Sequence, residues 1–261
     1  MELPIYQVDA FASRVFTGNP AAICPLQAWL PDATMQAIAM ENNLAETAFF
    51  VKTATGYHLR WFTPATEVDL CGHATLASAH VIFQLLEPAL ASVRFETLSG
   101  PLTVTRQDDL LTLDFPARPP QPATPCAGLL EALGGHPEAV LAARDYMIVY
   151  GSEAEVRALQ PDMMGLLDID RFAVIVTAPA TTPDVDFVSR FFAPAKGVPE
   201  DPVTGSAHCT LVPYWAQRLG KDRLTALQVS PRGGELLCEW QGDRVTMAGR
   251  GVLYLRGTIE I

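Results

Sequence analysis

Two short motifs recur, in the same order, in the two halves of this chain. Residues 60–65 (RWFTPA) return as residues 190–195 (RFFAPA), which is 190 − 60 = 130 positions later. The triplet 72–74 (GHA) returns as 205–207 (GSA), 205 − 72 = 133 positions later, so the second half has three extra residues between its motifs. Shared order and nearly constant spacing favour an internal duplication over a chance match. The chain is therefore expected to fold as two related halves.

Each pair of motifs also stands in the same local context. Strand-like segments precede them at residues 48–51 and 172–177, and apolar helix-like runs follow at residues 75–86 and 208–219. Pro213 is expected to interrupt the second run. Duplicated halves usually pack about an approximate twofold axis, which predicts that the two Gly-containing helix starts face each other across a cleft. Helix starts offer unpaired N–H groups and the positive end of the helix dipole, so such a cleft suits a carboxylate or an enolate.

The first half is expected to mix strands and helices. Period-two and apolar segments bounded by turn residues indicate the strands, and apolar residues at helical spacing indicate the helices. The first helix should begin at Asp32, whose side chain can cap the amides that follow. The expected elements are strands at residues 3–11, 21–24, 46–51 and 58–63, and helices at residues 32–43 and from 74 to about 86.

Residues 115–125 separate the two halves. Five of these eleven residues are prolines, and a stretch so poor in amide donors favours neither a sheet nor a helix. We interpret it as a linker between an N-terminal domain, residues 1–117, and a C-terminal domain, residues 118–261, whose final strand can pack on the first domain. A rigid proline-rich loop within one domain is the alternative, which the repeat disfavours.

The charge balance limits the expected partners. Acidic residues number 29 against 18 basic ones, giving a net charge of −11 without any basic run. Neither nucleic acid nor an anionic membrane surface is therefore an expected partner. The N-terminus lacks the pattern of a secretion signal, and no apolar stretch approaches the roughly 20 residues that span a bilayer, so a cytoplasmic location is expected. A small anionic substrate remains compatible, because a few local donors can hold a carboxylate.

The residues that bind metals and cofactors are sparse. Five cysteines are scattered without a Cys-x-x-Cys pair, which favours reduced thiols over zinc or a disulfide framework. No cluster has metal-ligand spacing and no phosphate-binding glycine motif is present, so neither a metal nor a cofactor is expected. His80 and His208 lie in helix-like runs, where packing or hydrogen bonding is their expected role. Arg232 and Arg250 are candidates for holding a substrate carboxylate.

Seven segments carry a further, more specific signal. They are residues 8–11 (VDAF), 18–22 (GNPAA), 43–49 (NLAETAF), 60–64 (RWFTP), 71–75 (CGHAT), 192–194 (FAP) and 200–208 (EDPVTGSAH). Together they resemble the phenazine-biosynthesis (PhzF-like) family, whose relatives share the fold of diaminopimelate epimerase. The resemblance implies an α+β fold of two pseudo-symmetric domains, each a curved, mostly antiparallel sheet around a central helix, with the active site between them. It also implies a homodimer.

Glu46 matches the catalytic glutamate of that family. Its neighbours Leu44, Ala45, Ala48 and Phe49 are apolar. Such surroundings disfavour the charged form of an unpaired carboxyl, which suits a group that takes and returns a proton near neutrality. By its local sequence alone, Glu46 is an ordinary glutamate at a strand edge, and the family motif is what favours catalysis.

The resemblance assigns further site residues. Asp201 and His73 join Glu46 as catalytic candidates that position the substrate or relay protons. The helix dipole beside His73 disfavours its protonation, which favours a neutral imidazole. Turn formation and capping are the structural alternatives for Asp201 and Ser206. The residues expected to line the substrate pocket are Asn19, Cys71, Gly72, Ala74, Gly205 and Ser206.

The cysteines decide between two kinds of isomerase. Epimerase relatives use one cysteine from each half, and here only Cys71 falls at such a place, whereas residues 201–204 occupy the matching place in the second half. Cys71 is ambiguous, because a helix start should lower the pKa of its thiol, yet small buried residues are common there. Cys209 falls inside the helix and is expected to pack.

The sequence therefore predicts a cofactor-independent isomerase that acts on a small carboxylated metabolite. Glu46 would remove a proton and redeliver it elsewhere, giving a double-bond shift or a tautomerisation. The alternatives are an amino-acid racemase or epimerase with two opposed bases, and a metabolite-binding protein that has kept the fold without the reaction. Intact candidates at the four positions Glu46, His73, Asp201 and Ser206 favour the enzyme.

Overall fold

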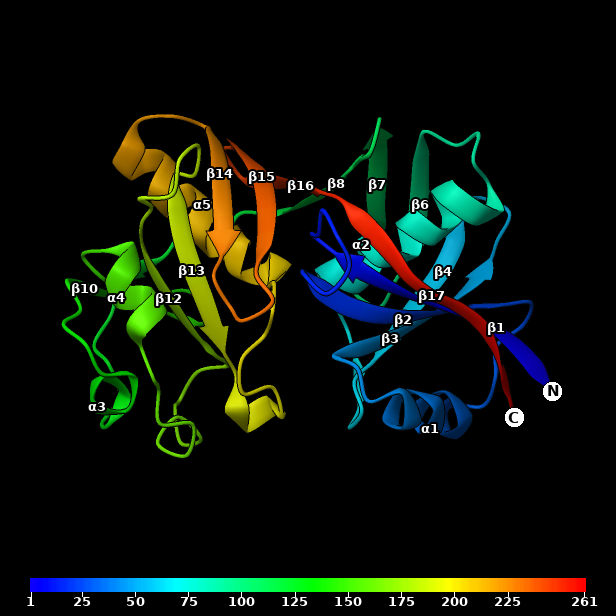
Figure 1. Cartoon of the computed structure of the whole chain (residues 1–261), viewed down its shortest axis with the longest axis horizontal. Helices are drawn as coiled ribbons and strands as arrows, with labels where there is room; N and C mark the ends of the chain where they lie inside the picture. The colour runs from blue at the N-terminus through cyan, green and yellow to red at the C-terminus, as the bar shows by residue number, and fades with distance from the viewer. The chain divides into compact units, whose positions relative to one another are not determined.

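The computed structural model describes all 261 residues and divides into two compact units (Figure 1). Unit 1 comprises residues 1–114 and 248–261, and unit 2 comprises residues 115–247. The final strand, β17 (Gly251–Glu260), belongs to unit 1, where it pairs with β1 (Glu2–Ala10). No helix is long and apolar enough to span a membrane.

Unit 1 is built on a curved sheet of mixed but mainly antiparallel pairing. Its other strands are β2 (Asn19–Leu26), β3 (Glu46–Lys52), β4 (Tyr57–Phe62), β5 (Glu67–Val68), β6 (Ser92–Glu96), β7 (Leu102–Gln107) and β8 (Leu110–Pro116). Strands β2 and β3, and strands β4 and β6, pair in parallel. The pairs β1–β17, β1–β2, β3–β4, β4–β5, β6–β7 and β7–β8 are antiparallel.

The helix α2 (Gly72–Val81) forms the centre of unit 1. Eight of its ten residues are buried, and it contacts β1, β2, β3, β7 and β17. A helix buried on all sides needs apolar or small residues all round, which its Ala-rich sequence provides. The π-helical turn Ile82–Leu86 continues it. A second helix, α1 (Asp32–Asn42), packs Met35, Ile38 and Ala39 against β3 and β4.

Unit 2 repeats this plan. Its strands are β9 (Gln121–Pro122), β10 (Ala139–Ala142), β11 (Tyr146–Val149), β12 (Val174–Pro179), β13 (Phe187–Phe192), β14 (Arg223–Gln228), β15 (Gly234–Gln241) and β16 (Arg244–Gly249). The succession from β10 to β15 is antiparallel, parallel, antiparallel, parallel, antiparallel. The succession from β1 through β2, β3, β4 and β6 to β7 is the same. Equal pairing in equal order confirms the predicted pseudo-symmetry.

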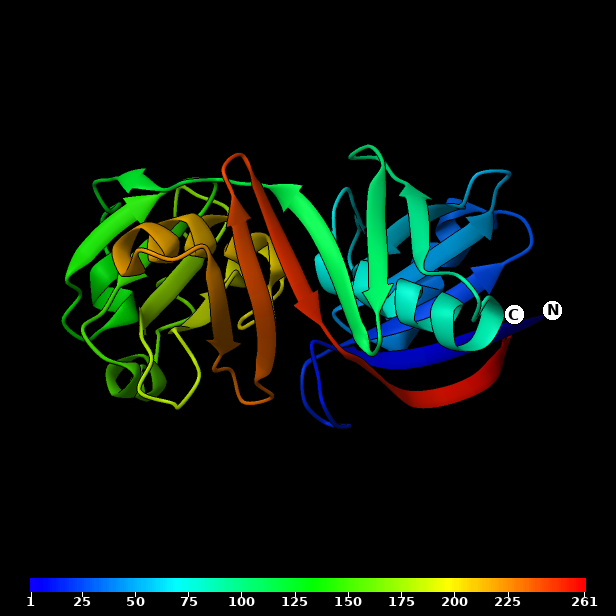
Figure 2. The same cartoon turned by 90° about the horizontal axis from the view of Figure 1, so that it is seen from above.

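The long helix α5 (Gly205–Leu219) takes the place of α2 in unit 2. Ten of its residues are buried, and it contacts β14 and β15 (Figures 1 and 2). Two short helices, α3 (Leu129–Leu133) and α4 (Glu153–Ala158), pack in a second apolar cluster with Tyr146, Ile148 and Phe192. A 3-10 turn, Pro194–Lys196, follows β13.

An arginine at the same place in each unit explains the repeated motif. Arg60 of β4 makes two hydrogen bonds of 2.7 Å to the carboxylate of Glu67. Arg190 of β13 makes the same forked contact with Glu200, at 2.7 and 3.0 Å. Glu200 follows Glu67 by 200 − 67 = 133 positions, the spacing of the glycine triplets. The duplication thus preserved an ion pair that holds the loop after the strand.

Three expectations of local structure need correction. Asp32 does not cap α1, because the helix begins at Asp32 itself, and the carbonyl of Pro31 accepts from the amides of Thr34 and Met35. The Asp32 carboxylate instead accepts a 2.9 Å bond from Arg60. The proline-rich segment is not free of sheet, since β9 pairs with β10.

Pro213 does not interrupt the second central helix, which runs continuously from Gly205 to Leu219. A proline removes the N–H that would bond to the carbonyl four residues earlier. That carbonyl belongs to Cys209, and it accepts a 2.8 Å bond from the amide of Arg118 instead. A partner from another segment therefore satisfies the group that proline leaves open.

Candidate active site

Glu46 and Asn19 stand at the starts of two neighbouring parallel strands. Ala21 of β2 pairs with Glu46 of β3, and Asn19 is the first residue of β2. Gly18 precedes it with φ +69°, and a Cβ there would lie 2.2 Å from the carbonyl oxygen of Ala10. Only glycine fits this turn. The turn therefore sets Asn19 at the start of β2, beside the start of β3 where Glu46 stands.

His73, in the first turn of α2, joins these side chains into one cluster. Its Nε2 lies 3.0 Å from Oε2 of Glu46. Its Nδ1 lies 3.2 Å from Nδ2 of Asn19 and 3.5 Å from Sγ of Cys71. The Glu46 and His73 side chains are 16% and 6% exposed. The structure thus brings four of the sequence candidates together in unit 1, and their role in a site stays a prediction.

The contact between Glu46 and His73 is close but not tightly aligned. The two atoms are within ion-pair distance, yet neither Oε2 of Glu46 nor Nε2 of His73 makes an aligned hydrogen bond with another protein group. A buried polar atom without such a bond is costly unless a ligand or a proton uses it. The pair is thus held at the distance over which a proton can pass.

The charge state of His73 differs from the expectation based on the helix start. Burial opposes a charged imidazole, but the Glu46 carboxylate favours it and raises the pKa of His73 well above its ordinary value. The carboxylate 3.0 Å away outweighs the helix dipole, which acts from backbone groups. The imidazolium would be a donor on both nitrogens, and the Asn19 amide can present either a donor or an acceptor to it.

Cys71 also differs from the expectation. Burial and the nearby Glu46 carboxylate raise the pKa of the Cys71 thiol to about 11, against the smaller lowering influence of His73. The thiol therefore stays protonated near neutral pH, and a helix start does not make it a thiolate here. Cys209, which the sequence expected to pack, is likewise buried, and burial raises the pKa of its thiol to about 11.

Glu46, Cys71 and His73 also form a group of three metal-ligand side chains. Sequence spacing gave no sign of it, because β3 and α2 bring the residues together only in the fold. The Cys71 sulfur approaches Nδ1 of the imidazole, whereas Glu46 approaches Nε2. One ligand atom from each of the three side chains lies within 4.8 Å of the other two. The cluster therefore differs from the expectation that no metal-ligand group is present.

The start of α2 offers backbone donors beside this cluster. Cys71 is its N-cap residue, and no side chain caps the helix. The first amides of a helix have no partner within the helix and lie at its positive end, so they attract anions. Gly72 and Ala74, both expected in the substrate pocket, belong to this turn.

In unit 2 the loop before α5 holds Asp201 in a network of polar contacts. The hydroxyl of Thr204 donates to the Asp201 carboxylate. Gln228 of β14 accepts a 2.8 Å bond from the Thr204 amide and donates at 2.8 Å to the Asp201 carbonyl. Gln228 is fully buried and fixes the loop. Sequence reasoning missed it, because a lone glutamine near a strand end belongs to no recognisable motif.

The start of α5 resembles that of α2. Thr204 is the N-cap residue and no side-chain hydrogen bond caps the helix. Gly205 is buried and Ser206 is half-buried. His208 donates from Nδ1 to the Thr204 carbonyl at 2.8 Å, since a carbonyl can only accept. This contact confirms hydrogen bonding as the role expected of His208, and burial lowers its pKa to about 4.

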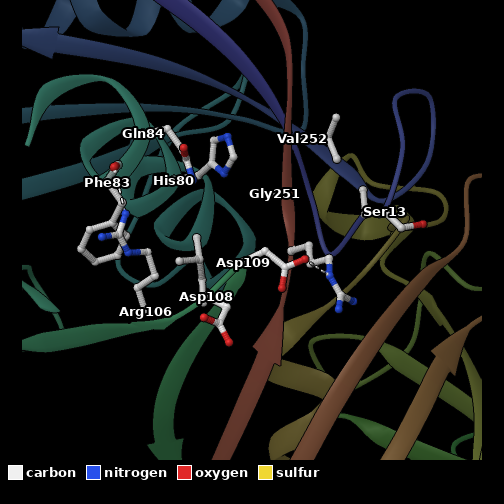
Figure 3. A pocket seen from close by; sticks show the side chains of 12 residues that line it. Ser13, His80, Phe83, Gln84, Arg106, Asp108, Asp109, Gly251 and Val252 are labelled. Atoms are coloured by element: carbon white, nitrogen blue, oxygen red, sulfur yellow. Dashed lines mark hydrogen bonds and ion pairs between the residues drawn. The ribbon is translucent and has the colours of Figure 1, made fainter. Parts of the chain in front are cut away.

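A separate cavity of about 200 Å³ in unit 1 contains His80 and Arg250 (Figure 3). Nε of Arg250 donates to Asp109 at 2.6 Å. Arg106 donates to the carbonyls of Phe83 and Pro88 at 3.1 and 2.8 Å. Both arginines are thus already partnered within the protein. Arg250, a sequence candidate for holding a substrate carboxylate, is held by an acidic neighbour, which weakens that role.

Comparison with known proteins gives a consistent result. Residues 8–257 match the family model described as phenazine biosynthesis-like protein. An uncharacterised isomerase of Pseudomonas aeruginosa is 54% identical over the full length of both chains. A crystal structure of a PhzF-family phenazine biosynthesis protein from Enterococcus faecalis covers both chains completely, with a TM-score of 0.97 and 47% identity. A hydroxyproline epimerase from Agrobacterium vitis, at 11% identity and a TM-score of 0.61 over 99% of this chain and 92% of its own, shares the fold alone.

The fold and the relatives together define an isomerase of the α+β, diaminopimelate epimerase-like type. The chain belongs to the phenazine biosynthesis-like (PhzF) family.

Proposed function

We propose that this isomerase moves a proton within a small carboxylated metabolite without a cofactor, with Glu46 as the acid/base. The product would be a double-bond isomer or a tautomer. The observation that carries the proposal is the 3.0 Å contact between the mostly buried Glu46 carboxylate and the imidazole of His73. General acid–base catalysis needs a carboxyl that can both lose and regain a proton, and this neighbour supports that exchange.

The reaction we propose has one proton carrier. Glu46, as carboxylate, takes a proton from a carbon made acidic by an adjacent carboxyl or conjugated group. The electron pair left on that carbon shifts into the substrate's conjugated system. The carboxylic acid then returns the proton to a different atom, and Glu46 is a carboxylate again. His73 stabilises the carboxylate as an imidazolium before and after the transfer.

Two observations support a carboxyl shuttle over a two-thiol racemase. The raised pKa of Cys71 keeps its sulfur protonated at neutral pH, and a thiol is a poor base. In the second unit, Thr204 stands where Cys71 stands in the first, because 204 − 71 = 133, the spacing of the glycine triplets. A pair of opposed cysteines is therefore missing at the repeated position.

The helix start supports the proposed class of carboxylated substrate. Uncapped amides at Gly72 and His73 lie in the same turn as the imidazole, and a substrate carboxylate bound there would sit near the Glu46 side chain. The predicted contributions of Asp201, Gly205 and Ser206 to catalysis or binding stay predictions. The homodimer implied by the family resemblance and the cytoplasmic location are predictions as well.

A substitution series tests the proposal. A panel of small carboxylated, conjugated metabolites is screened by NMR with the natural chain, Glu46→Gln, Cys71→Ser and Glu41→Gln. Glu41 is an exposed residue of α1 and serves as the matched control. The proposal expects turnover to disappear in Glu46→Gln and to persist in Cys71→Ser and Glu41→Gln. Loss of turnover in Cys71→Ser with retention in Glu46→Gln would overturn it.

The same panel separates an enzyme from a binding protein. If the natural chain binds one of the metabolites but never converts it, and Glu46→Gln binds it equally well, the chain has kept the fold for binding alone.

A further inference from the structure

Three side chains of unit 1 form a donor set for a cation. Glu46 begins β3, and Cys71 and His73 lie at the start of α2. One ligand atom from each lies within 4.8 Å of the other two. Oε2 of Glu46 and Nε2 of His73 are buried and make no aligned hydrogen bond. Buried polar atoms in that state are rare in native proteins, and a bound ion is one way to satisfy them.

The types of donor select the ion. A thiolate, an imidazole nitrogen and a carboxylate oxygen are the ligands that Zn²⁺ prefers, with bonds of about 2.3, 2.0 and 2.1 Å. Mg²⁺ and Ca²⁺ prefer sites made of oxygen atoms alone. We propose that Glu46, Cys71 and His73 together bind one Zn²⁺ ion and that this ion inhibits the isomerase. The inhibition rests on the proposed function of Glu46, whereas the binding does not.

The distances are compatible with a tetrahedral site. Around a zinc ion with those bond lengths, neighbouring ligand atoms lie about 3.5 Å apart. Sγ of Cys71 lies 3.5 Å from Nδ1 of His73, and Oε2 of Glu46 lies 3.0 Å from Nε2. Because these contacts are to different nitrogens, binding of one ion requires the ring or the carboxylate to rotate. The widest separation in the set, at most 4.8 Å, must shorten by about 1 Å, which such rotations can supply.

Charge balance favours the bound ion. Zinc binds the deprotonated forms of its ligands, so the Cys71 thiol proton and one proton of the His73 imidazolium pass to solvent. The thiolate and the Glu46 carboxylate then carry two negative charges against the two positive charges of the ion. A buried cluster without net charge costs far less than a buried isolated charge. The chain's net charge of −11 also favours the approach of a cation.

The cluster is reachable from solvent through Glu46, whose side chain is 16% exposed against 6% for His73. The three side chains fill three positions of a tetrahedral zinc ion, and the fourth stays open for water. A carboxylate bound to zinc is a weak base, because the ion competes with the proton for its oxygen atoms. Bound zinc should therefore stop proton transfer by Glu46.

Zinc uptake by the full chain tests the binding without a substrate. The metal-free natural chain is titrated with Zn²⁺ in competition with a chromogenic chelator, and one bound ion per chain is expected. Cys71→Ser, Glu46→Gln and His73→Asn should each weaken binding by at least about tenfold. Cys126→Ser removes a partly buried cysteine outside the cluster, so it is the matched control and should keep the natural affinity. An excess of Mg²⁺ should not displace the zinc.

Cobalt gives a readout on the natural chain that does not depend on the folding of a variant. Co²⁺ can replace zinc in sites of this kind, and a thiolate bound to it adds an intense charge-transfer band in the near ultraviolet. The natural chain and Cys126→Ser should show this band, and Cys71→Ser should lack it. On a substrate found by the metabolite screen, one equivalent of Zn²⁺ should lower the turnover of the natural chain at least tenfold, and a chelator should restore it.

Three results would overturn the proposal. The natural chain could take up no zinc in competition with the chelator. It could take up zinc that Cys71→Ser and His73→Asn bind equally well, or bind cobalt without the thiolate band, which would place the ion elsewhere. It could also bind zinc in the cluster and keep full turnover. The first two results leave the role of Glu46 untouched, and full turnover in Glu46→Gln would refute that role while leaving the zinc site in place.

Discussion

The two units share a scaffold and differ at the residues that could do chemistry. Strand pairings follow the same order in both, and Arg60–Glu67 has its counterpart in Arg190–Glu200. Phe49 pairs with Arg60 and Val176 with Arg190, so Ala173 of unit 2 corresponds to Glu46. His73 corresponds to Ser206. The unit 2 counterpart of the carboxylate–imidazole pair therefore contains neither group.

The comparison shows which features of the duplicated unit have been kept in both halves. The forked ion pair and the Gly-led helix recur because they hold the loop and the central helix in each unit. The first residues of that helix and the strand start beside it diverged. In unit 2 the equivalent space is fixed by Gln228, which holds Thr204 and Asp201. Unit 1 thus contains the carboxylate–imidazole pair, and unit 2 a polar loop held by hydrogen bonds.

The largest expected effect tests the chemical difference between the two units. Glu46→Gln should lower kcat/KM by about 10³-fold, within the range for loss of a general acid/base. Ser206→Ala, at the position equivalent to His73, should lower it by about tenfold or less, because serine is not a proton carrier at neutral pH. Steady-state kinetics on the substrate found by the screen measure both. Equal losses of kcat/KM in the two variants would contradict the expected difference between the two units.

The two arginine pairs should differ in their contribution to stability. Arg190 also donates to the carbonyls of Val156 and Leu159, and its pair with Glu200 is the more buried. Removing one partner of a buried pair leaves the other charge unpaired, so Glu200→Gln should cost about 3 kcal/mol of unfolding free energy. Glu67→Gln should cost about 1 kcal/mol, because Asp32 still pairs with Arg60. Urea unfolding of both variants measures the two losses of unfolding free energy. A larger loss in Glu67→Gln than in Glu200→Gln would contradict this expectation.

Acid should weaken unit 2 through Glu153. Glu153 is buried, which would raise its pKa, but bonds from Thr181, Arg157 and Thr182 lower it to about 2. A depressed folded pKa gives stability that is present above the unfolded value near 4.5 and lost as pH falls toward 2. Glu153→Gln should therefore cost about 3 kcal/mol at pH 7. The gap between the two proteins should close by pH 2 in a series of denaturant melts.

His208 acts in the same direction at higher pH. Burial lowers its pKa to about 4, so its contribution to stability is present above the unfolded value near 6.5 and is lost as pH falls toward 4. His208→Gln should flatten the stability profile between pH 6.5 and 4 while leaving the fall below pH 4 in place. A variant whose profile keeps the full slope in that window would contradict this assignment.

The smallest expected effect concerns His73. Its folded pKa is raised, so the stability that its charged form contributes is complete below about pH 6.5 and is lost as pH rises through the folded value. The difference in unfolding free energy between the natural chain and His73→Asn should thus be greatest in mild acid and smaller in alkali. An opposite slope would mean that the imidazole is neutral beside Glu46.

Sequence reasoning reached the fold through the repeat. Two motifs at offsets of 130 and 133 were enough to predict two related halves, because strands and central helices recur with them. Apolar periodicity gave the approximate bounds of α1, β3 and β4. The prediction failed where a tertiary contact overrode a local preference. Helix α1 begins at Asp32 itself, whose carboxylate bonds to Arg60, and the amide of Arg118 satisfies the carbonyl that Pro213 leaves open.

The site was predictable in part for a related reason. Glu46, His73, Cys71 and Asn19 lie in recognisable motifs, so the resemblance indicated them. Their charge states were not predictable, because they depend on distances between β3 and α2 that no spacing along the chain reveals. The contact with Glu46 reversed the expectation for His73, and burial reversed it for Cys71. Gln228 lay in no motif and only the fold connects it to Asp201.

One isotope measurement tests the single-carboxyl mechanism most directly. A substrate carrying deuterium at the carbon that loses its proton is converted in ordinary water in a single turnover, and the product is analysed by NMR and mass spectrometry. One carboxyl that takes and returns the same proton predicts that part of the deuterium reappears at a different atom of the product. Complete loss of deuterium, with inversion at the original carbon, would instead show two opposed bases and contradict the central role of Glu46.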